Sequence, residues 1–265
     1  YLMPNLLPIL ALLFNALART RIDFATAAPL IASGAAATVC GIALALLARP
    51  LFRQDGSAFA SRFQCAFRFN SYIGLAVLGK LHGAAGIATM GLLIGAMVPL
   101  VNLASVWMLA RQGNLGVGRE MARNPLVLAS LAGFAFSTSG LTLPDFASHF
   151  LGRLGDAAVA LGLLAVGAAL RLRGPTGSPL GSCYLLAVKL IAVPAAALLV
   201  ALSLGLGRVH LDAAVLFAAL PTATSAYILT QRMGGDGAGV AWLVSANTLA
   251  AMATLPVWLS IVLRY

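Results

Sequence analysis

The chain has 265 residues, of which 61% are hydrophobic and only 9% are charged. A soluble domain carries about a quarter charged residues, so this chain could not cover its own surface in water. The formal net charge is +10, but the 17 Lys and Arg residues stand singly between apolar runs and form no basic block. The composition therefore predicts an all-α polytopic membrane protein and argues against a nucleic-acid partner.

Apolar segments long enough to cross a bilayer recur along the whole chain. A bilayer core of about 30 Å needs roughly 20 helical residues per crossing. The hydrophilic stretch at 111–124 separates two groups of segments, so we expect a first unit at 1–110, a cytoplasmic loop at 111–124 and a second unit at 125–265. In chain order, the nine segments lie at approximately 2–18, 26–48, 63–79, 84–110, 125–143, 147–170, 181–206, 211–231 and 237–263.

The orientation of the segments follows from their basic loops. Lys and Arg favour the cytoplasmic ends of membrane helices. Alternate loops hold nine of these residues on one side and six on the other, which places the 111–124 loop inside and Tyr265 outside. The chain opens with Tyr1 rather than Met, so we expect its N-terminus to be incomplete. Cys40, Cys65 and Cys183 have no metal-site spacing, so we expect no disulfide, no metal and no cofactor.

Two short stretches indicate internal symmetry. GKLHGAAGIATMG (79–91) and QRMGGDGAGVAWL (231–243) align with one gap, and the alignment pairs Gly83 with Gly235. In the predicted topology the segments that precede them cross the membrane in opposite directions, which is typical of an inverted repeat. Two repeats of five helices would require one more helix before Tyr1, so this chain would hold nine of ten.

Two of the apolar segments contain polar residues and helix breakers. ALPTATSAYILT (219–230) contains Pro221, and FRFNSYIGLAVLG (67–79) contains Asn70 and Gly74. Irregular backbone at membrane depth is tolerated only where it is buried or lines a cavity. Broken segments at matching positions in two halves predict the binding site of a transporter, whereas an ordinary proline kink is the simpler alternative. We expect the two breaks to cross near the midplane, where half-helix N-termini attract anions.

The candidate site residues surround these breaks. Arg68 could pair with a carboxylate or extend to the headgroups. Asp156 and Lys189 are candidates for ion coupling or charge pairing, the alternatives being a solvated mouth and snorkelling. Asp212 and Asp236 fall at segment ends, where we expect solvated helix caps. The predicted substrate-binding set is Arg68, Asn70, Ser71, Gly74, Pro221, Thr222, Thr224, Ser225 and Asn247.

Four stretches together resemble bacterial members of the auxin efflux carrier family, with the malonate-transporter-like permeases as the nearest branch. They are RFNSYIGLAVLG, the Asn124–Pro125 pair, LGDAAVALGLLAVGAAL (154–170) and ALPTATSAYILTQRMGGD, and the resemblance covers nearly the whole chain. It implies two inverted five-helix repeats with crossed broken helices, and transport of small organic anions. Carried onto this sequence, it places the first crossover at Asn70–Gly74 and the second at Pro221–Ser225. Many members have a proline after the glycine of the first crossover, where this chain has Leu75, so we expect a gentler first break.

The sequence therefore predicts a secondary active transporter for a small organic anion such as malonate, in a bacterial inner membrane. An enzyme is not expected, because no histidine lies at membrane depth to activate a serine, and no nucleotide-binding motif is present. An uncoupled channel, a sensory protein of the same fold and a sodium-coupled symporter for another organic anion stay open as alternatives. The expected partners are the substrate, membrane lipid, and a proton or sodium ion; a homodimer is left open.

Overall fold

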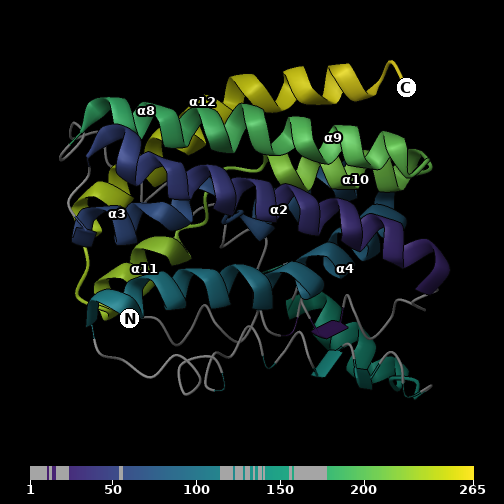
Figure 1. The fold of residues 1–265 in the computed structure, drawn as a ribbon. Coiled ribbons are helices and arrows are strands. Elements are labelled where there is room, and N and C mark those ends of the chain that lie inside the picture. Colours follow the sequence, from purple (N-terminus) through teal and green to yellow (C-terminus); the bar gives the residue numbers. More distant parts are fainter. Residues whose placement is uncertain are drawn as a thin grey trace.

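The computed structural model describes residues 24–53, 56–113, 141–154 and 178–265, with a few single residues elsewhere. Within these ranges every regular element is a helix, and the long helices lie side by side (Figure 1). The predicted segments 2–18, 125–143 and 147–170 fall wholly or largely outside the described residues.

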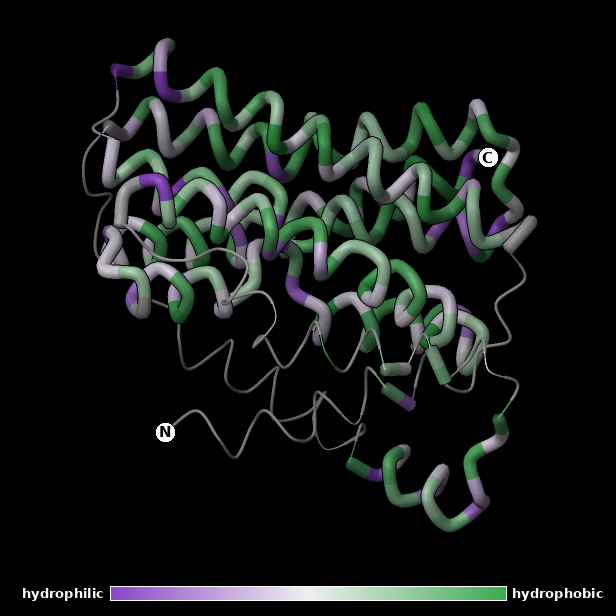
Figure 2. Tube along the Cα trace, turned by 60° about the horizontal axis from the view of Figure 1, so that its bottom comes forward, coloured by the Kyte–Doolittle hydropathy of each residue, from purple (hydrophilic) through white to green (hydrophobic). Residues whose placement is uncertain are grey.

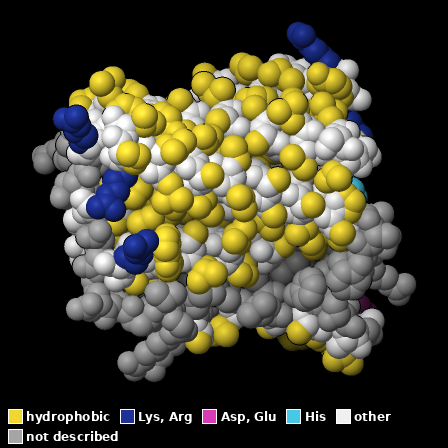
Figure 3. All heavy atoms as spheres, viewed as in Figure 1, with side chains coloured by type: hydrophobic (Ala, Val, Ile, Leu, Met, Phe, Trp, Pro, Cys, Tyr) yellow, Lys and Arg dark blue, Asp and Glu magenta, His cyan; other side chains and the backbone are white. Residues whose placement is uncertain are grey.

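Four described stretches are long and apolar enough to cross a membrane. Hydrophobic residues run along these helices, as Figure 2 shows, and hydrophobic side chains cover the middle of the face in Figure 3, with Lys and Arg near its margins. Over the described residues, the all-helical fold with several membrane-spanning helices that the composition predicts is therefore confirmed, whereas the count of nine segments stays a prediction. The four stretches are Ala27–Phe52, Gly56–Arg111, Pro179–Ser203 and Gly237–Val262.

The first part of the described chain contains a helix that breaks and then folds back on itself. After α2 (Phe24–Phe52), the helix α3 (Gly56–Phe63) continues into the 3₁₀ turn η1 (Gln64–Ala66), and α4 (Ser71–Gly113) begins after four intervening residues. Inside α4, Gly83 has φ 59° and ψ −138°, and the chain reverses there. The two arms of α4 are therefore packed as a hairpin.

The second part repeats this order of elements after a helix with a π-turn. α8 (Pro179–Ala187) leads through the π-helical turn η2 (Val188–Ala192) into α9 (Val193–Ser203). Then α10 (Arg208–Ala219) ends at a break, α11 (Ser225–Arg232) follows, and α12 (Gly237–Val262) runs to the C-terminal end. A short helix, a break, a short helix, a glycine turn and a long helix thus occur in both parts.

A missing backbone donor explains one contact between these helices. Pro194 has no N–H, so it cannot bond the Leu190 carbonyl four residues earlier, as an α-helix would require. Trp258 Nε1 on α12 donates to that carbonyl at 2.8 Å. The irregular turn of η2 and α9 is therefore satisfied by a side chain from α12.

The centre of the protein is α10. Every residue from Leu211 to Leu220 is buried, and this helix contacts α2, α4, α9 and α12. The second break follows directly from this helix. A polar, irregular backbone therefore lies in the interior, where its groups need partners from the protein.

The third apolar segment begins earlier than the sequence predicts. We placed its start at residue 63 and counted Arg62 as a loop residue, but α3 begins at Gly56 and Arg62 is only 3% exposed. Ser57, Ser61 and Arg62 lower the hydropathy of this helix, which is why a search for uniformly apolar runs missed it. The eighth predicted segment, 211–231, also differs from the structure, because it consists of two helices, α10 and α11, with the second break between them.

Candidate functional site

The first break spans Phe67–Asn70, and Asn70 starts the next helix. The Asn70 Oδ1 atom accepts from the backbone N–H of Tyr72 at 3.1 Å and of Ile73 at 3.4 Å, which is the geometry of an N-cap. We predicted this break at Asn70–Gly74, and the structure corrects that position, because the cap makes the chain helical from Ser71 onward.

Gly74 has a packing role within α4. A Cβ placed on it would lie 2.8 Å from Leu220 Cδ1 and 3.1 Å from the sulfur of Met90. The absence of a side chain at residue 74 therefore lets α4 approach Leu220, the first residue of the second break. The glycine brings the two breaks together and does not open the first one.

The second break spans Leu220–Thr224, in agreement with the predicted position to within one residue. Pro221 ends α10 because its ring clashes with the preceding turn and it has no N–H to donate. Helical structure resumes at Ser225, the first residue of α11. Seven apolar residues (213–219) thus run up to the break, and hydroxyl-bearing residues lie within it and directly after it.

The two breaks contact each other through backbone and side chains. Asn70 N–H donates to the Pro221 carbonyl at 2.9 Å, and the Thr222 hydroxyl donates to the Cys65 carbonyl at 2.7 Å. Beside them the rings of Phe69 and Phe217 pack with centroids 4.3 Å apart. The sequence correctly predicted that these two distant segments meet.

Two polar pairs extend this contact beyond the breaks. Arg68 Nη2 donates to the Ser225 hydroxyl at 3.0 Å, and Gln64 Nε2 donates to the Thr230 hydroxyl at 2.8 Å. Arg68 is only 6% exposed, and its Nη1 atom is buried with no hydrogen-bond partner in the described part of the chain. A buried donor left unpaired costs about 1–3 kcal/mol, and more when it is charged. The guanidinium therefore retains a donor for a further acceptor.

Lys189 lies in the π-helical turn η2 and is 1% exposed. Its Nζ atom donates to the Ala218 carbonyl at 2.8 Å, in the last turn of α10. The side chain is therefore buried in the protein and does not extend to the headgroups. A positive charge at the C-terminal end of a helix is favourable, because the helix dipole and the free carbonyls are negative there.

The other predicted site residues have weaker connections to the breaks. Asn247 is fully buried on α12, where its Nδ2 atom donates to Leu243 of the same helix and its Oδ1 atom has no partner among the described residues. Ser71 and Thr224 are half-buried beside the breaks. Asp156 lies outside the described residues.

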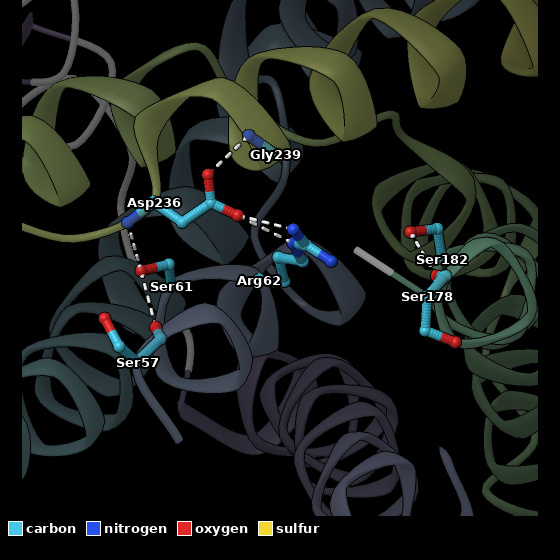
Figure 4. Close-up of polar contacts among 7 residues, drawn as sticks. All are labelled: Ser57, Ser61, Arg62, Ser178, Ser182, Asp236 and Gly239. Carbon is cyan, nitrogen blue, oxygen red and sulfur yellow. Dashed lines mark hydrogen bonds and ion pairs between the residues drawn. The ribbon is translucent and has the colours of Figure 1, made fainter. Parts of the chain in front are cut away.

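An ion pair that the sequence did not predict joins α3 to the turn between α11 and α12. Arg62 on α3 donates through Nε and Nη2 to Asp236 Oδ2, at 3.0 and 2.5 Å (Figure 4). Asp236 Oδ1 caps α12 by accepting from Gly239 N–H, and the Asp236 N–H donates to the Ser61 hydroxyl. Asp236 is a helix cap, as predicted, but it also binds α3 to the turn between α11 and α12.

A second polar cluster contains Asp212, which we expected to be solvated. Asp212 is 5% exposed, and its Oδ2 atom contacts His82 Nε2 at 2.7 Å and Arg208 Nε at 3.1 Å. The carboxylate can be buried because two basic side chains share it. Only the Arg208–Asp212 spacing of four residues signals this cluster in the sequence. It joins the Gly83 hairpin to the beginning of α10.

Comparison with known proteins identifies the class of protein that has this site. A family described as "Membrane transport protein" matches residues 109–259, more than half of the chain. The chain belongs to this family. This chain is 27% identical to a protein of Rhizobium meliloti (strain 1021) named "Putative malonate transporter". The alignment covers 92% of this chain and 80% of that protein. The resemblance seen in the motifs is therefore confirmed, and the protein is a transporter rather than an enzyme.

Proposed function

We propose that the transporter is a secondary active carrier of a small organic anion, a mono- or dicarboxylate such as malonate, in a bacterial inner membrane. The substrate would bind where the two breaks meet. The observation that carries this proposal is Arg68, a buried guanidinium at the contact with one hydrogen bond to Ser225 and one free nitrogen.

The charge around the breaks favours an anion. Arg68 and the N-terminal end of α4 contribute positive potential. The carboxylates among the described residues are Asp145, Asp212 and Asp236; Asp145 is exposed, and the other two are bound by basic residues elsewhere. None of them contacts Arg68. A guanidinium pairs with a carboxylate through two parallel hydrogen bonds, so a carboxylate is the ligand that best suits this residue.

Hydrogen-bonding groups for the substrate are available on both breaks. Asn70 uses Oδ1 as a helix cap, which leaves its Nδ2 free to donate to a ligand. Ser71, Thr222, Thr224 and Ser225 would supply hydroxyls from the two breaks. Asn247 has a buried amide oxygen with no partner among the described residues, and we propose that it contributes to the same substrate site from α12.

We also propose that residues 1–110 and 125–265 form the two inverted repeats, with the breaks as the crossed helices. A glycine with positive φ in the turn that follows each break supports this reading, since Gly83 has φ 59° and Gly234 has φ 71°. Pairing Gly83 with Gly234, one residue from the pairing in the sequence alignment, places Asn70 opposite Pro221. These are the two residues joined by the backbone hydrogen bond, as a two-fold crossing would require.

We propose that two charged residues couple substrate transport to its driving force. Lys189 places its amino group on the carbonyl end of α10, and in its protonated form it would balance negative charge during the passage of an anion. Asp156 is the proposed proton carrier. Transport would then follow a proton gradient or the membrane potential, with a sodium-coupled symporter as the alternative.

The test is uptake of labelled malonate into proteoliposomes under imposed proton, sodium or potential gradients. We expect one gradient to drive uptake, and Arg68→Gln to reduce uptake by at least tenfold. The matched control is Arg264→Gln, which removes an exposed positive charge near the C-terminus and should leave uptake unchanged. Equal loss in both variants would reject Arg68 as a substrate ligand, and folded protein that takes up no malonate under any gradient would reject this substrate.

A further inference from the structure

A concave site with two arginines lies at the end of the protein where α2 and α4 finish. Its volume is about 260 Å³. This is smaller than the roughly 300–1,000 Å³ of cavities that enclose a drug-sized ligand, so the site suits a small polar headgroup better than a whole amphiphile. The residues that line this arginine pocket are Leu46, Arg49, Pro50, Phe59, Met108 and Arg111.

The pocket combines a buried apolar floor with a charged rim. Phe59 of α3 and Met108 of α4 are buried, whereas Arg49 and Arg111 are exposed. In the described part of the chain neither arginine has a carboxylate partner, since the three ion pairs there involve Arg62, His82 and Arg208. Two guanidinium groups that share one concavity, with no counter-ion among the described residues, form a binding site for an anion.

The surroundings of the pocket are those of a membrane surface. Trp107 is 43% exposed, and the Arg111 guanidinium carbon lies 4.8 Å from the centroid of its ring. Tryptophan is typical of the zone between hydrocarbon and headgroups. Leu46 and Leu47 are exposed on α2, next to Arg49 in the sequence. Figure 3 shows that hydrophobic side chains extend inward from the Lys and Arg side chains at the margin of that face.

We propose that the arginine pocket binds the phosphate headgroup of an anionic phospholipid, whose acyl chains lie along the exposed leucines of α2. The arginines supply charge complementary to a phosphodiester, and the adjacent apolar surface distinguishes a lipid from a free anion. The pocket shares no residue with the two breaks. A retained lipid would hold the ends of α2 and α4 together while other helices move.

The experiment uses the purified full chain in neutral detergent and follows its thermal unfolding. Short-chain phosphatidylglycerol, short-chain phosphatidylcholine and inorganic phosphate are titrated separately. We expect phosphatidylglycerol to raise the unfolding midpoint and the other two to have little effect. Equal stabilisation by phosphatidylcholine, or by phosphate alone, would overturn the proposal, and neither comparison requires a variant.

Variants then locate the site. Arg49→Gln with Arg111→Gln should weaken the apparent affinity for phosphatidylglycerol roughly thirtyfold, as expected for two arginines at a membrane surface. The control, Arg53→Gln with Arg264→Gln, removes the same number of exposed charges from outside the pocket and should retain the wild-type affinity. An unchanged affinity in the pocket variant, or an equal loss in the control, would contradict the assignment.

Discussion

The backbone N–H of Asn70 donates to the carbonyl of Pro221 across the contact between two helix breaks 151 residues apart, at 2.9 Å. Pro221 has no N–H to return, so a single backbone hydrogen bond joins these two residues. The surrounding bonds are made by side chains, from Thr222 to the Cys65 carbonyl and from Arg68 to Ser225. Substitutions in this region can therefore remove ligand contacts while the backbone link is retained.

The first prediction separates capping from ligand binding at Asn70. Asn70→Asp keeps an oxygen that can cap α4 but places a negative charge beside the proposed anion site. We expect the unfolding midpoint to change little and malonate uptake to fall at least tenfold. Asn70→Ala loses the cap, at a cost of about 1 kcal/mol, and should lose uptake as well. Normal uptake by folded Asn70→Asp would contradict the proposed site.

The second prediction concerns Lys189. Lys189→Met keeps most of the side-chain length but removes the charge and the bond to the Ala218 carbonyl. The unpaired carbonyl costs about 1–3 kcal/mol, and release of a buried charge offsets part of this cost. We expect folded protein with strongly reduced uptake. The other lysine in the chain, Lys80, is exposed, and Lys80→Met is the matched control. Full uptake by Lys189→Met would show that Lys189 has only a structural role and no role in transport.

The third prediction tests the pair between Arg62 and Asp236. Asp236→Ala removes a carboxylate that binds a buried arginine and caps α12, so we expect a loss of about 3–5 kcal/mol in unfolding free energy. Asp145→Ala changes an exposed carboxylate and should cost less than about 0.5 kcal/mol. Denaturation of both variants in the same detergent gives the comparison. Equal stability would mean that the pair contributes nothing to the fold.

The fourth prediction uses two glycines that have open space around them. Gly83 has φ 59° and ψ −138°, a region that side chains disfavour, so Gly83→Ala should cost about 1–3 kcal/mol through backbone strain alone. Gly207 has φ −65°, and Gly207→Ala should be neutral or slightly stabilising. Thermal unfolding distinguishes the two. An unchanged midpoint for Gly83→Ala would show that the reversal in α4 tolerates a side chain.

The sequence predicted the class of protein, the helical fold and the meeting of two interrupted segments. These features follow from local signals, namely long apolar runs and a proline or asparagine at membrane depth. The sequence placed the first break too late. An asparagine followed by a glycine could have marked either the interior of the break or its end, and only the hydrogen bonds from Tyr72 and Ile73 to Asn70 show that the next helix begins there. The local sequence could not show that Gly74 packs on Leu220.

Polar residues in amphipathic helices were the main source of error. Arg62 lowers the hydropathy of α3, so the helix was read as part of a loop, although its partner is Asp236, far along the chain. Asp212 was expected to be solvated because its partner His82 is likewise distant in the sequence and comes from a different helix. Pairings between residues more than a hundred positions apart leave no periodic trace in a single sequence.

The bond from Trp258 to the Leu190 carbonyl has an optical consequence. Indole emission shifts in wavelength when its N–H exchanges a protein acceptor for water, so this residue reports directly on the separation of η2 and α12. The chain has three tryptophans, and Phe at positions 107 and 242 would leave Trp258 as the sole emitter. The transport cycle could then be followed in real time by native fluorescence, without an attached dye.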